Sequence, residues 1–168
     1  MADDVLGGLR LWRLIWALSL SDIKQRYRGS LLGPFWLTIS MGVQIATMAA
    51  VYGGLFHVDI HAYLPYLTVS IVSWAYMSTL ISEGCSCFIQ AETLIKGNRM
   101  PLFVHAARSI VRNTIILGHN MIVVVIVFVV MGVPLSLRSM AAIPALGLWI
   151  VDALALSLLS GALCARFR

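Results

Sequence analysis

Long apolar runs alternate with short polar segments along most of this chain. Four runs, at roughly residues 35–56, 64–89, 114–131 and 142–163, carry almost no charged side chains. About 20 apolar residues in a helix cross the ~30 Å hydrocarbon core of a bilayer. The third run is the shortest and extends back toward Ile110, so we place it at 110–131. The pattern predicts four transmembrane helices.

Residues 9–28 show a different pattern, in which polar and apolar positions follow a helical repeat. One stripe is polar, at spacings of three or four: Arg10, Arg13, Ala17, Ser21, Lys24 and Arg28. A second face is apolar: Leu9, Trp12, Trp16 and Leu20. This arrangement is typical of an amphipathic helix in the membrane interface, and a helix that only anchors the chain explains it too. Within this helix we expect an i,i+4 ion pair between Asp22 and Arg26.

The stretch GSLLGPFW, residues 29–36, separates this helix from the first span. Pro34 suits the first turn of a new helix, and Gly33 suits the position before it. We therefore expect the chain to lie flat as far as Tyr27, to turn, and to enter the membrane at Phe35. This gives a cytoplasmic N-terminal segment with an elbow helix at 1–33 and a transmembrane domain at 34–168, with a cytoplasmic loop at about 90–109.

Composition and charge strengthen this interpretation. The chain of 168 residues is 60% hydrophobic and only 11% charged, whereas soluble domains carry about twice that charge. Of its 12 lysines and arginines, only Arg138 lies in a segment on the far side of the predicted spans. Cytoplasmic loops are rich in these residues, so both termini should be cytoplasmic. We interpret the net charge of +5 in this way and not as nucleic-acid binding. The expected fold is an all-α polytopic membrane protein.

A few polar residues interrupt the predicted spans, namely Glu83, His119, Asn120 and Asp152. A carboxylate at mid-membrane costs about 2.5–3.5 kcal/mol on insertion scales, so such groups should face protein or water. They are candidates for lining a transport path, although hydrogen bonds between helices are the more common reason for such residues. We expect Asp152 to pair with His119 or with a polar group of another span, or to be neutral.

Small residues form two stripes, each with a spacing of four. The stripes are Gly42, Ala46, Ala50 and Gly54 in the first span, and Ala153, Ser157, Gly161 and Ala165 in the fourth. Such stripes allow helices to approach closely.

Sites of enzymatic chemistry are not evident in the sequence. There is no G-x-x-x-x-G-K-[ST] phosphate loop, no zinc-binding cysteine pattern, and no nucleophile–base pair near the membrane surface. His57, Asp59 and His61 supply too few ligands for a metal site. We expect a protein that is not an enzyme and that binds neither metal nor cofactor itself.

Three stretches resemble a known family. Residues 22–43, DIKQRYRGSLLGPFWLTISMGV, are similar to the N-terminal signature of the permeases of polysaccharide-exporting ABC transporters. These are type-2 ABC permeases that export O-antigen, capsule or teichoic acid chains. Residues 92–113, ETLIKGNRMPLFVHAARSIVRN, resemble the family's cytoplasmic loop and the start of its third span. GHNMIVV at 118–124 resembles its third span, and ARFR at 165–168 resembles the end of its fourth.

The resemblance implies a transmembrane subunit in the bacterial cytoplasmic (inner) membrane. Two copies would form a homodimer around a path for lipid-linked polysaccharide, and a separate ABC ATPase subunit would bind ATP and Mg. The resemblance also implies two sets of functional residues. The ATPase-coupling loop would use Glu92, Lys96 and Arg99, and the elbow, which would form the gate for the lipid-linked substrate, would use Lys24, Arg26, Tyr27, Arg28, Gly33 and Pro34.

Family members have six spans, and this chain carries the first four. We therefore expect a C-terminally truncated permease, for which the alternative is a non-transporting membrane remnant, anchor or assembly protein. A four-span proton-coupled exporter of small molecules ranks last. Such exporters need a membrane carboxylate, and the first span has only Gln44 where they carry theirs.

Overall fold

The computed structural model describes residues 7–26, 28, 33, 35–57, 59–92, 97, 101–134 and 141–166. These residues form helices joined by turns, without a strand among them. The helices are α2 (Trp12–Arg26), α3 (Phe35–Phe56), α4 (Ile60–Gln90), α6 (Leu102–Val130) and α7 (Ala142–Arg166). Within this described part, α3, α4, α6 and α7 are long and apolar enough to cross a membrane. The predicted all-α fold with four such helices is therefore confirmed.

The helix ends follow local signals. α3 has the bounds that the apolar run predicts. α4 begins at Ile60, earlier than predicted, because Asp59 caps it and accepts a hydrogen bond from the backbone N–H of His61 at 3.0 Å. α6 begins at Leu102, directly after Pro101, so residues 102–109 belong to this helix and not to the loop in which we expected them.

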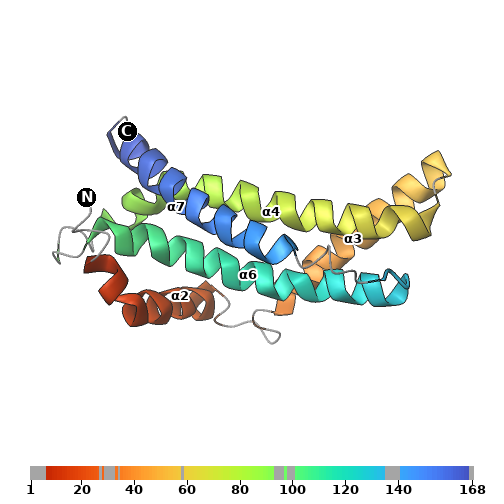
Figure 1. Ribbon diagram of the computed structural model, residues 1–168, viewed down its shortest axis with the longest axis horizontal. Helices are drawn as coiled ribbons and strands as arrows, with labels where there is room; N and C mark the ends of the chain where they lie inside the picture. Colours follow the sequence, from red (N-terminus) through yellow and green to blue (C-terminus); the bar gives the residue numbers. More distant parts are fainter. Residues whose placement is uncertain are drawn as a thin grey trace.

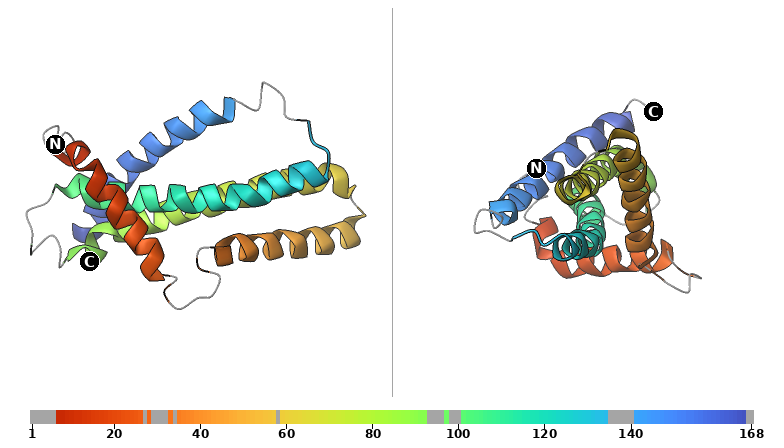
Figure 2. Two further views of the ribbon diagram at one scale, coloured as in Figure 1. Left: turned by 90° about the horizontal axis from the view of Figure 1, so that it is seen from below. Right: turned by 90° about the vertical axis from the view of Figure 1, so that its right-hand side faces the viewer.

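The helices form an elongated bundle (Figures 1 and 2). α4 and α6 run side by side through its middle, with α3 along one side and α7 crossing α4 on another. α2 lies across the first turns of α6, at the end of the bundle where α4 ends and both chain termini are found. α3 is much shorter than α4 or α6 (22 residues against 31 and 29), so the α2 end extends beyond it.

The buried core joins α3, α4, α6 and α7. It consists of Ile45, Val72, Tyr76, Leu80, Ile110, Leu117, Val123, Val124 and Ala153. Large apolar side chains cover the outside, as shown by Val129 and Leu148, which are 75% and 74% exposed. Asn113 and Asn120 are buried. An apolar exterior around a core that contains polar groups is the arrangement expected of a protein surrounded by lipid.

Of the two predicted small-residue stripes, the one in α7 is used for packing within the chain. A Cβ atom on Gly161 would lie 2.8 Å from Cys87 Sγ and 3.0 Å from the carbonyl oxygen of Gly84. A Cβ atom on Gly84 would lie 2.9 Å from Ser157 Oγ. Glycine at these positions therefore permits the close contact of α4 with α7. The stripe in α3 is different, because a Cβ atom on Gly42 or Gly54 would meet no atom within 4 Å.

α2 buries one face. Ile15, Ser19 and Ile23, spaced by four, are buried against α6, where Ile15 packs with Phe103 and Val104. Trp12 and Trp16 are 61% and 48% exposed. Arg13 and Lys24 are exposed as well. The aromatic face that we predicted is therefore not the face that α2 uses to pack against its own chain.

Candidate functional site

Four charged side chains from three helices meet where α2 crosses α6. We call Asp22 of α2, Glu83 of α4, and Arg108 and Arg112 of α6 the ion-pair cluster. Asp22 accepts hydrogen bonds from Arg108 Nε at 2.7 Å, from Arg108 Nη2, and from Arg112 Nη1 at 3.0 Å. Arg112 Nη2 donates to Glu83 Oε2 at 2.7 Å. Arg112 therefore bridges the two carboxylates and links α2 to α4 through α6.

Neutral polar groups complete the surroundings of Glu83. Asn113 Nδ2 donates to Glu83 Oε2 at 2.6 Å, and Ser109 Oγ donates to the same oxygen at 3.1 Å. Arg26 Nη1 lies 3.7 Å from Glu83 Oε1. The carboxylate is thus surrounded by donors from two other helices.

The helical repeat explains why these groups converge. Arg108 and Arg112 are four residues apart on α6, and so are Ser109 and Asn113, so each pair lies on one side of the helix. On α2, the fully buried hydroxyl of Ser19 lies 2.9 Å from the carbonyl oxygen of Arg108. This contact holds α2 close to α6, one turn before Asp22.

The cluster is largely shielded from solvent. The exposed fractions of the side chains are 11% for Asp22, 16% for Glu83 and Arg112, and 23% for Arg108. The charges balance within the cluster, and the more exposed Arg26 adds one positive charge. Removing one member of a buried ion pair typically costs about 3–5 kcal/mol, because it leaves the other charge uncompensated. The cluster is therefore suited to holding α2 in one position.

The predicted pair of Asp22 with Arg26 is wrong, and the partners of Glu83 are now known. Asp22 does not pair with Arg26, as we expected from their spacing, because it points to α6, while Arg26 reaches Glu83. Glu83 makes hydrogen bonds between helices, which was the more common of the two roles considered for it.

The other polar residues of the spans are dispersed. The His119 ring Nδ1 lies 2.9 Å from the carbonyl oxygen of Ile115, and the ring makes a T-shaped contact with Phe35. Asn120 is buried, and within the described ranges its side-chain oxygen has no hydrogen-bond partner. Asp152 is exposed on α7, and among the described residues no hydrogen bond or ion pair joins it to His119.

The predicted elbow and coupling residues are only partly within the described residues. Lys24, Arg26 and Arg28 are exposed, and Gly33 has a positive φ of 53°, which is the conformation that glycine favours. Glu92 is half-buried just after α4. Four further predicted residues lie outside the described ones: Tyr27, Pro34, Lys96 and Arg99.

A cavity of about 340 Å³ lies next to the cluster, between α3, α4 and α6. Arg26 lines it, together with the polar side chains of Tyr76, Asn113 and Asn120. Apolar side chains, including Leu37 and Met41, line it as well. A cation beside a cavity with both polar and apolar lining suits a molecule with an anionic head and an apolar tail.

Reasoning from sequence missed Arg108, Arg112 and the buried His105 as site residues. The signal was present, since two arginines four residues apart precede a strongly apolar stretch and require partners. Comparison with models of known protein families, with curated proteins and with solved structures finds no match to this chain.

Proposed function

We propose that this chain is a transmembrane permease subunit of an ABC transporter that exports lipid-linked polysaccharide. One observation carries the proposal. The two stretches with the most extensive resemblance to that family, residues 22–43 and 92–113, meet in space at the ion-pair cluster. Asp22 from the first stretch binds Arg108 and Arg112 from the second. Direct contact between two stretches that lie far apart in the sequence supports the idea that both belong to the same transport protein.

The arrangement supports a route for energy from a separate ATPase. In this proposal ATP and Mg bind to that partner, and the loop with Glu92, Lys96 and Arg99 contacts it. α6 follows this loop, and its first turns carry the arginines that hold Asp22. A movement of the loop would therefore reach α2 through charged contacts and not through flexible chain.

The substrate is proposed to enter beside α2. Arg26 lies between the cluster and the 340 Å³ cavity, where it is in reach of a lipid phosphate. The exposed Trp12 and Trp16 suit a helix at headgroup level. Lys24 and Arg28 add positive charge near the same helix end. These features support a role for the elbow as the gate for a lipid-linked glycan.

The exposed face of α7 supports assembly with a further protein surface. Asp152 is the one carboxylate in α7 and lies near the middle of this mainly apolar helix, next to Trp149 and Leu156. A carboxylate there is unfavourable against lipid, so in the membrane this face calls for protein cover. A second permease copy is the cover that our proposal supplies.

The bacterial inner membrane, with both termini cytoplasmic, is the proposed location. The two chain ends lie at the end of the bundle where α2 packs on α6 (Figure 1), and the ion-pair cluster joins these two helices. Arg26, Arg108 and Arg112 gather at that end as well, in line with the enrichment of cytoplasmic segments in basic residues.

Deletion of the gene tests the proposal. The deletion strain should lose its surface polysaccharide and accumulate the lipid-linked precursor inside the cell, and a plasmid copy should reverse both effects. The double charge reversal Lys96→Glu with Arg99→Glu should abolish co-purification of the ATPase while the permease stays in the membrane. Normal surface glycan in the deletion strain would instead favour the non-transporting anchor or assembly protein.

A further inference from the structure

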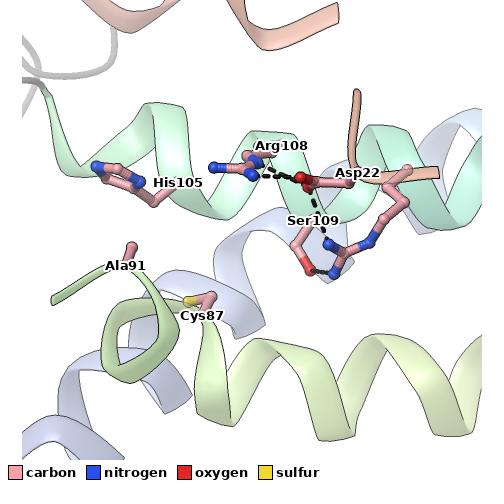
Figure 3. Close-up of a pocket in the computed structure, with 7 residues that line it drawn as sticks. Asp22, Cys87, Ala91, His105, Arg108 and Ser109 are labelled. Atoms are coloured by element: carbon pink, nitrogen blue, oxygen red, sulfur yellow. Dashed lines mark hydrogen bonds and ion pairs between the residues drawn. The ribbon is translucent and has the colours of Figure 1, made fainter. Parts of the chain in front are cut away.

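A second, smaller pocket lies on the other side of the ion-pair cluster, between α2, α4 and α6 (Figure 3). Its volume is about 210 Å³. It is lined by Asp22, Cys87, Ala91, His105, Arg108, Ser109 and Arg112. The export proposal does not use this pocket.

His105 is the most unusual residue of this pocket. Only 3% of the residue is exposed, yet neither ring nitrogen has a hydrogen-bond partner among the described residues. Buried polar side chains nearly always have partners, so a ring with two unsatisfied nitrogens indicates that something else meets them. His105 also lies in the first turn of α6, where the helix dipole favours negative charge.

The two arginines have donors left over as well. Arg108 uses Nε and Nη2 to bind Asp22, and its third guanidinium nitrogen points along α6 toward His105 (Figure 3). Arg112 Nε is buried and has no partner in the part of the chain that the structure describes. The lining therefore offers unsatisfied nitrogens from an imidazole and two guanidinium groups.

The free donors of the lining favour an anion. Asp22, the carboxylate of the lining, is already occupied by three hydrogen bonds from Arg108 and Arg112. Glu83 binds Arg112 from outside the lining and balances the second guanidinium group, so the free donors and not a net charge favour an anion. A tetrahedral oxyanion has several acceptor oxygens pointing in different directions, which matches donors arranged on different sides of a pocket.

We propose that this pocket binds a phosphate group, held by His105 and by the free donors of Arg108 and Arg112. The phosphate can come from a lipid headgroup or from a free phosphate compound, and both present the same oxygens to the site. Bound phosphate would strengthen the contact of α2 with α6, because Arg108 and Arg112 take part in both interactions.

Thermal unfolding of the full chain in dodecyl maltoside tests this. Sodium phosphate and, separately, dioctanoyl phosphatidic acid are added at an ionic strength matched with sodium chloride. Above Kd, each tenfold increase of a bound ligand should raise Tm by about 3–5 °C. His105→Leu removes no hydrogen bond that the structure contains, so it should fold and lose this response. His61→Gln, an exposed position at the opposite end of α4, should keep it.

A second measurement needs no change to His105. In a chain with Cys85→Ser and Cys164→Ser, Cys87 is the remaining thiol and lines the pocket. At ten times Kd, phosphate should slow the reaction of Cys87 with N-ethylmaleimide roughly tenfold, because only the empty pocket admits the reagent.

The outcomes separate the two phosphate sources. A response to both compounds supports a site open to free phosphate, and a response to the lipid alone supports a headgroup site. The proposal is overturned if neither compound raises Tm above the chloride control and neither slows the reaction of Cys87. That result indicates a pocket filled with water only. Equal stabilisation of His105→Leu and the unmodified chain would overturn it too. Neither result bears on glycan export, which the deletion experiment tests separately.

Discussion

The substitution Asp22→Asn tests whether the ion-pair cluster holds α2 on the bundle. It removes one charge and replaces one carboxylate oxygen by an amide nitrogen. In the native structure the carboxylate accepts bonds from Arg108 Nε at 2.7 Å, from Arg108 Nη2 and from Arg112 Nη1 at 3.0 Å. Asparagine keeps one acceptor oxygen, and its amide donors then face a guanidinium group.

The size of the effect follows from these contacts. A hydrogen bond to a charged group contributes about 1.5–3 kcal/mol. Losing one such bond and weakening the two others should cost about 2–3 kcal/mol in the free energy that holds α2 in place. Solvent offsets little of this, because only 11% of the Asp22 side chain is exposed. A cost of about 2 kcal/mol raises the detached fraction of α2 roughly 30-fold.

Hydrogen exchange measured by mass spectrometry in detergent reports on this local opening. The α2 amides should exchange roughly 30-fold faster in Asp22→Asn, whereas those in the middle of α4 should not change. Asp59→Asn is the matched control, because it also removes one carboxylate but leaves a side chain that caps α4 equally well. If the α2 amides of Asp22→Asn exchange within threefold of their rate in Asp59→Asn, the ion-pair cluster does not hold α2 on the bundle.

Two further substitutions test the packing between the long helices by thermal unfolding in detergent. Gly161→Ala places a methyl group 2.8 Å from Cys87 Sγ and should destabilise the bundle by about 1–3 kcal/mol, while Gly54→Ala meets open space and should be neutral or slightly stabilising. Equal effects would contradict the close α4–α7 contact. Tyr76→Phe removes the 3.0 Å hydrogen bond to Thr114 and should cost about 1 kcal/mol, and an unchanged Tm would show that this bond contributes nothing.

The apolar pattern predicted the long helices well because their lengths are set by a physical dimension, the thickness of a bilayer. α3 has the predicted ends, and α7 begins at the predicted residue. Where a helix begins earlier than the apolar pattern predicts, the residue just before it marks the start. Asp59 extends the start of α4, and Pro101 marks the start of α6 within the segment that we assigned to a loop.

The site was less predictable, because spacing along one helix does not reveal which other helix lies beside it. Asp22 and Arg26 have the spacing of a local pair, but Arg108 lies closer to Asp22 in space, with a difference in sequence position of 86. The two stripes of small residues show the same difficulty. They look alike in sequence, but among the described residues the stripe in α7 packs against another helix and the glycines of the stripe in α3 do not.

Export in a deletion strain that carries single variants is the most direct test of the whole account. Surface polysaccharide is quantified in strains with equal amounts of membrane-inserted protein. We predict that the wild-type gene restores export, that Asp22→Asn restores much less, and that Ser21→Ala, whose hydroxyl accepts an exposed hydrogen bond from Gln25, restores it fully. Full export with Asp22→Asn, or none with the wild-type gene, would contradict the account.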